Sequence, residues 1–187
     1  MPRAAHLTAR FIALLFAACA TIAQAQIEEA ASASTPANAP PSQKLSATDQ
    51  QFIQDAGTAG ATEIAASKLA LTRSGDKDVK EFAQRMIADH AKLARNLDVI
   101  AKRHGITSPP SADSSVTGSL QNLKGADFDK AYIEKVALAA HQKAVELFAK
   151  ESEKGNDAAL KAAAAKALPI LRHHYAMAQQ LAKAKAS

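Results

Sequence analysis

The stretch from Asp76 to Gly105 is the part of this sequence that most constrains the fold, because it carries a helix start, a helix stop and a continuous apolar stripe. Asp76 can accept hydrogen bonds from the first backbone amides of a helix, and Gly105 can adopt the left-handed conformation that ends one. One histidine, His90, interrupts the stripe near its midpoint. A helix with such a stripe has to pack against other helices. The stripe comprises Val79, Ala83, Met86, Leu93, Ala94, Leu97 and Ala101.

Three further segments show apolar residues at helical spacing. The first covers residues 48–73, with Thr48 as its predicted N-cap. The second covers about 127–154 and the third about 156–184. Aromatic residues make up only 4% of the chain and alanine is abundant, which favours helices that pack closely. We therefore predict an all-α fold, a four-helix bundle over residues 48–184.

A long connection, residues 106–126, separates the second predicted helix from the third. Its length allows either a local return or a crossover along the bundle. Just after it, Tyr132 is predicted to point away from His141 on an ideal helix, and so to stay out of any polar layer formed by that histidine. We expect Phe128 and Tyr132 to pack beneath the connection, and a ligand-binding surface is the alternative.

The first 25 residues have the pattern of a signal peptide, which predicts export to the periplasm. Arg3 and Arg10 supply the positive charge, residues 11–20 the apolar core, and an Ala-x-Ala site follows. The apolar run is short for a membrane span, and we predict no transmembrane segment in the mature chain. Lipid attachment at Cys19, which would tether the protein to a membrane, is the alternative to ordinary export.

Residues 26–47 are rich in Ala, Ser and Pro, which predicts a disordered linker. The whole chain has 23 Lys and Arg against 18 Asp and Glu, and charges of both signs are interspersed along the predicted helices. Such mixing is typical of a solvated surface and gives no indication of nucleic-acid binding. The sequence contains no glycine-rich phosphate loop or nucleophile elbow, so it assigns no catalytic residue and names no protein partner.

One polar residue interrupts the inward stripe of each predicted helix: Glu63, His90, His141 and His174. Each lies within about three residues of its helix midpoint, which places all four within roughly 5 Å of one level in either topology. Three imidazoles and a carboxylate suit Zn, Fe, Cu or Mn, so we predict a site for a single transition-metal ion. A buried hydrogen-bonded network without metal is the alternative.

Several phrases resemble an exported bacterial family, domain of unknown function 4142 (DUF4142), counted among ferritin-like folds. The resemblance implies a ferritin-like four-helix bundle and no settled activity. The family's recurrent positions correspond to Glu63, Asp89-His90, His141, Leu168-Pro169, Leu171 and His174. The phrases are FIQDAGTAGATEIAASKLAL at 52–71, EFAQRMIADHAK at 81–92, FDKAY at 128–132, HQKAVELF at 141–148 and LPILRHHYAMA at 168–178.

The sequence departs from di-iron ferritins, which use about four inward carboxylates and paired Glu-x-x-His motifs. No glutamate precedes His90, His141 or His174 by three residues, and the predicted inward acids are Glu63 and Glu134. Ferroxidase chemistry is therefore not predicted. Two hypotheses remain: an exported bundle that holds one metal ion, in metal handling or stress protection, and a metal-free helical module of the cell envelope.

Overall fold

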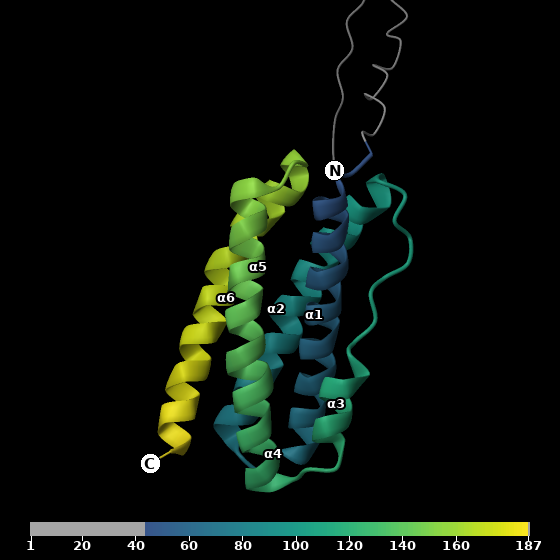
Figure 1. Cartoon of the computed structure of the whole chain (residues 1–187). Helices are drawn as coiled ribbons and strands as arrows, with labels where there is room; N and C mark the ends of the chain where they lie inside the picture. The colour runs from purple at the N-terminus through teal and green to yellow at the C-terminus, as the bar shows by residue number, and fades with distance from the viewer. Residues whose placement is uncertain (1–43, 187) are drawn as a thin grey trace, which may run out of the picture. The chain divides into compact units, whose positions relative to one another are not determined.

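Four long helical segments form a bundle in the computed structural model, which describes residues 44–186 (Figure 1). They are α1 (Ala47–Arg73), α2 (Lys77–Arg103), a composite third segment and α6 (Ala158–Lys185). The predicted all-α bundle is confirmed. The predictions of a signal peptide over residues 1–25 and a lipidated Cys19, and nearly all of the linker predicted over 26–47, lie outside the described residues.

The helix ends follow local hydrogen bonding. The predicted N-cap Thr48 was wrong, because the Ser46 hydroxyl, two residues earlier, accepts the Asp49 amide at 3.1 Å and α1 begins at Ala47. Asp76 caps α2 as predicted, and its carboxylate accepts the amides of the second and third residues that follow. Gly105 ends α2 with a φ of 77°, a backbone conformation that glycine adopts without strain.

The third segment combines α4 (Gly125–Tyr132), a π-helical segment η1 (Ile133–Ala140) and α5 (His141–Lys154) into one continuous rod. A π-helix closes its hydrogen bonds five residues apart, so its residues rotate less about the axis than those of an α-helix. The side of the rod on which a residue lies therefore differs, across η1, from the side calculated for a straight α-helix. Glu134, predicted to point inward, is exposed, whereas Tyr132 is fully buried.

The connection between α2 and α4 crosses the length of the bundle, so α2 and α5 run in the same direction (Figure 1). It packs along α1 and contains the short helix α3 (Ser114–Gln121). Two contacts fix its path: Pro110 lies where a Cβ on Gly57 would be, and the Asp113 amide donates to the Thr62 hydroxyl at 2.8 Å. A single long crossover is the arrangement of ferritin-like bundles.

The apolar core forms two large clusters, one toward each end of the bundle. One combines the C-terminal part of α1 with the start of α2, the crossover and η1, and includes Met86, Phe128 and Tyr132. The other combines the start of α1 with the end of α2 and the start of α6, and includes Phe52 and Leu160. The four predicted site residues belong to neither cluster and are buried at mid-height.

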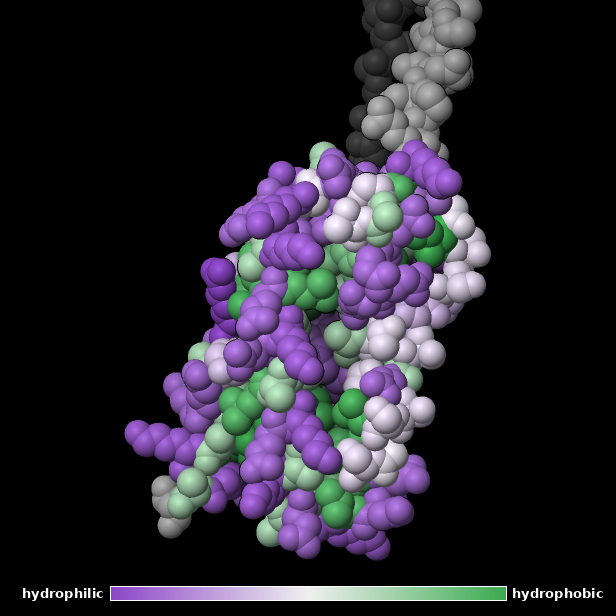
Figure 2. All heavy atoms as spheres, in the orientation of Figure 1, coloured by the Kyte–Doolittle hydropathy of each residue, from purple (hydrophilic) through white to green (hydrophobic). Residues whose placement is uncertain are grey.

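Polar side chains cover much of the face in Figure 2, with apolar ones in patches between them. Among residues 44–186, the structure contains no helix that combines the length and the apolar character required to cross a membrane.

Candidate metal centre

Four helices each contribute one buried polar side chain to the middle of the bundle. Glu63 comes from α1, His90 from α2, His141 from the first turn of α5 and His174 from α6, and none is more than 3% exposed. The centroids of the three imidazole rings lie 5.3 to 5.5 Å apart. The structure therefore brings together all four residues that the sequence placed in one layer.

Each imidazole is held by an acceptor at one of its two nitrogens. His90 Nδ1 lies 3.0 Å from Glu63 Oε2, and His174 Nε2 lies 2.9 Å from Asp89 Oδ2. His141 Nδ1 lies 3.2 Å from the backbone carbonyl of Val136 and 3.5 Å from Glu63 Oε1. Since carboxylates and carbonyls only accept, the nitrogen at each of these contacts carries the proton.

The other nitrogen of each ring is buried and has no hydrogen-bond partner among residues 44–186: His90 Nε2, His141 Nε2 and His174 Nδ1. One nitrogen from each ring lies within 4.8 Å of one from the other two. Buried polar atoms without a partner are rare and need an explanation. Metal-ligating histidines show this arrangement, with one N–H donated to a carboxylate or carbonyl and the second nitrogen on the ion.

The electrostatic environment of the centre favours the protonation states in which imidazole rings can bind a metal ion. Burial lowers the pKa of His141, and it lowers the pKa of His174 to about 4 although the bond to Asp89 favours the charged form. Burial alone would raise the pKa of Glu63, but its electrostatic interaction and hydrogen bond with His90, with smaller contributions from His141 and His174, lower that pKa overall. At neutral pH Glu63 is therefore an anion, while His141 and His174 are neutral and each offers a lone pair.

The π-helical segment places two groups beside the centre that straight-helix geometry did not predict. It presents the Val136 carbonyl to His141, and it turns Tyr132 inward, where the phenol and the Ser67 hydroxyl are 2.8 Å apart. Burial raises the pKa of Tyr132, and the Glu63 carboxylate adds to that effect. Tyr132 is buried in the apolar cluster with Phe128 and its hydrogen bond is to Ser67, so nothing in the described residues contradicts the prediction that it stays out of the polar layer. Its packing with Phe128 beneath the crossover was correct.

Asp89 was not among the predicted site residues, although it belongs to the Asp89-His90 pair on which the family resemblance rests. Its side chain is 34% exposed, and it reaches His174 because it precedes His90 on α2 and so faces the neighbouring helix α6. Two other histidines lie outside the centre. His173 is exposed on α6, and His104 is the C-cap of α2, 3.2 Å from Asp157.

Two crystal structures share this fold. A DUF305 fragment from Deinococcus radiodurans has a TM-score of 0.64 and 16% identity, over 75% of this chain and 99% of that chain. A "putative secreted protein DUF305" from Streptomyces coelicolor has a TM-score of 0.60 and 15% identity, over 75% of this chain and 94% of that chain. These identities establish likeness of fold alone.

No curated protein matches the sequence. A family profile does match, that of a domain of unknown function, and it covers residues 33–181. This match spans most of the chain, so the protein belongs to the DUF4142 family.

Proposed function

We propose that this protein binds one transition-metal ion through His90, His141 and His174. The observation that carries the proposal is the set of three buried ring nitrogens that lack any partner, on rings that converge at mid-bundle. A metal-free centre without bound water would leave three buried acceptors unsatisfied, each at a cost of about 1 to 3 kcal/mol. A bound cation would satisfy all three at once.

Glu63 and Asp89 would orient the ligand histidines around the ion. Both carboxylates already hold the outer nitrogens of ligand histidines, His90 and His174 respectively. Together with neutral imidazoles they would place two negative charges around a divalent cation, which balances its charge inside the low-dielectric core. Glu63 keeps one buried oxygen, Oε1, without a hydrogen-bond partner, and that oxygen could serve as a fourth ligand.

The donor set narrows the choice of ion. Three neutral imidazoles suit Zn, Cu and Fe, and divalent ions generally bind nitrogen sites in the order Mn < Fe < Cu, with Zn below Cu. Of the four ions named from the sequence, Mn is therefore the weakest candidate. Three protein ligands also leave a coordination position open, as in zinc sites that bind a further small ligand.

We infer a role in metal handling or stress protection outside the cytoplasm. The signal-peptide pattern of residues 1–25 supports export to the periplasm, and one buried ion per chain suits binding or delivery better than bulk storage. If no metal binds, the alternative hypothesis is a metal-free helical module of the cell envelope. The di-iron motif is incomplete, so no ferroxidase activity is proposed.

The test compares two neighbouring histidines of α6. The full chain is freed of metal and titrated with Zn²⁺, Cu²⁺, Fe²⁺ and Mn²⁺ by calorimetry, as the wild type and as His174→Ala and His173→Ala variants. We expect one ion per chain for the wild type and for His173→Ala, whose side chain is exposed. We expect no stoichiometric binding for His174→Ala, whose ring is fully buried at the centre.

Thermal unfolding provides a readout that also checks folding. A free ion at about 100 times its Kd stabilises the folded state by about 2.7 kcal/mol. Metal should therefore raise the Tm of the wild type and of His173→Ala, and leave the Tm of His174→Ala unchanged. If His174→Ala binds metal as the wild type does, or if the wild type binds none, the proposal is refuted.

A further inference from the structure

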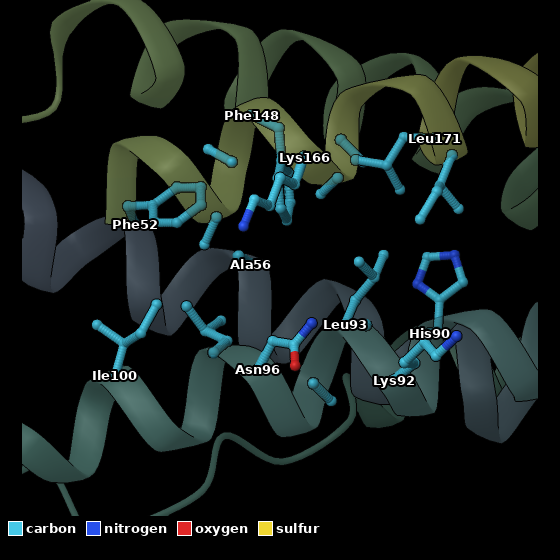
Figure 3. Close-up of a pocket in the computed structure, with 18 of the residues that line it drawn as sticks. Phe52, Ala56, His90, Lys92, Leu93, Asn96, Ile100, Phe148, Lys166 and Leu171 are labelled. Atoms are coloured by element: carbon cyan, nitrogen blue, oxygen red, sulfur yellow. The ribbon is translucent and has the colours of Figure 1, made fainter. Parts of the chain in front are cut away.

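An apolar groove of about 450 Å³ runs between α2 and α6 (Figure 3). Its floor comes from α1 and α5, where Phe52 and Phe148 meet edge to face with ring centroids 5.1 Å apart. Much of the remaining wall is alanine, including Ala56, Ala59 and Ala163. Because these side chains are short, the facing helices leave a space that the protein does not fill.

The dimensions of the groove match a small amphiphile. Its lining includes both Lys92 and Arg103 of α2, which at 1.5 Å per residue lie about 16 Å apart along the helix. At about 30 Å³ for each water-sized group, the volume holds roughly 15 such groups. A saturated chain of ten to twelve carbons fits within this space, and the volume lies within the range of ligand pockets.

The rim of the groove is positively charged. Lys92, Arg103 and Lys166 line it and are exposed, and in Figure 3 the amine of Lys166 lies over the groove near Ala56. The one acidic side chain in the lining is Glu63, which is 1% exposed and hydrogen-bonded to His90. A cationic rim above apolar walls is complementary to a ligand with an anionic head and an apolar body.

The inner end of the groove reaches buried polar atoms that have no partner. Glu63 and His90 both line it, and in the described part of the chain Glu63 Oε1 and His90 Nε2 form no hydrogen bond. Figure 3 shows the His90 ring at this end, close to Leu93 and Leu171. The groove is therefore continuous with the candidate centre, and a molecule in it would approach the side of the centre that Glu63 and His90 present.

We propose that the groove binds a medium-chain carboxylate of the fatty-acid class. The chain lies along the alanines of α1 and α6, and the carboxylate lies at the rim, in the positive field of the exposed lysines Lys166 and Lys92. The ligand would be held by the apolar walls and the exposed lysines, so its binding does not depend on a bound ion. The bundle would thus bind a second kind of ligand, and the apolar walls and exposed cations, not the imidazoles, would hold that ligand.

The test measures binding of decanoate to the metal-free full chain by calorimetry, below the concentration at which decanoate forms micelles. Decyltrimethylammonium has the same chain with a cationic head, and decanol has a neutral one. We expect one decanoate per chain, bound at least about tenfold more tightly than either comparison ligand. Equal affinities would overturn the carboxylate assignment, and no binding of any of the three would overturn the proposed site.

Two variants locate the ligand. Ala163→Phe fills the groove and should abolish binding, whereas Lys92→Glu/Lys166→Glu leaves the core intact and should weaken decanoate binding about tenfold. The matched control, Lys68→Glu/Lys143→Glu, reverses two exposed lysines outside the groove and should bind like the wild type.

Metal stoichiometry and sedimentation are measured on the same variants. Unchanged metal binding by Ala163→Phe separates a failure of the groove from a failure of the metal centre. Decanoate binding that survives both groove variants, or a chain dimer that Ala163→Phe dissociates in the absence of ligand, would refute the proposal.

Discussion

Glu151 near the end of α5 provides a quantitative test of the electrostatics at one end of the bundle. It is 5% exposed and shares a hydrogen bond with Asp49, whose carboxylate accepts the backbone amides of Asn156 and Asp157 at 3.0 and 3.1 Å. Burial, the negative charge of Asp49 and this hydrogen bond raise the pKa of Glu151 to about 7. The folded chain therefore keeps a proton there that the unfolded chain loses.

The direction in which stability changes with pH follows from the difference in proton binding between the folded and unfolded states. The ordinary pKa of the glutamate is 4.5, so the unfolded state ionises first as the pH rises. The stabilisation of the folded state that Glu151 contributes is therefore fully present below about pH 4.5, and it is lost progressively as the pH rises to about 7. The full pKa difference corresponds to about 3 kcal/mol, and solvent screening at this end of the bundle reduces the expected loss to about 1 to 2 kcal/mol.

The perturbation is Glu151→Gln, which keeps the shape and a hydrogen-bond donor toward Asp49 without the titrating proton. Unfolding in urea is measured at pH 5 and pH 8.5 for the wild type, for Glu151→Gln and for the exposed control Glu153→Gln. Between these pH values the wild type and the control should lose about 1 to 2 kcal/mol more stability than Glu151→Gln. A pH dependence of Glu151→Gln equal to that of the wild type would refute the reasoning.

Four further substitutions, of which Gly60→Ala is a control, test the fold and the centre. Gly57→Ala should destabilise the folded state by about 1 to 3 kcal/mol in urea unfolding, because its Cβ would collide with Pro110 of the crossover. In the same assay Gly60→Ala should leave the stability unchanged or raise it, because its Cβ meets only His90 Nδ1 at 4.0 Å. Asp89→Asn should weaken metal binding about 10- to 100-fold in calorimetry with little effect on Tm of the metal-free chain, and unchanged affinity would exclude Asp89 from the centre. Tyr132→Phe should cost about 1 kcal/mol in chemical denaturation, since Ser67 loses its buried partner, and an unchanged midpoint would show that this bond contributes nothing.

The sequence by itself determined the class of fold and the residues at its centre. Helical periodicity, the cap at Asp76 and the stop at Gly105 depend on neighbours a few residues apart, so they can be identified without a structure. The common height of Glu63, His90, His141 and His174 could also be predicted, because a helix midpoint stays at mid-height whichever way the helix runs.

Only the tertiary structure decided which groups lie beside those four residues. The contact between Asp89 and His174 depends on which helices are neighbours, and the path of the crossover depends on the packing of Pro110 against Gly57. The π-helical segment changed the faces of Glu134 and Tyr132, because a wider turn alters every angle calculated for a straight α-helix. Local sequence spacing determines where a residue lies along its helix, whereas packing between helices determines what that residue meets.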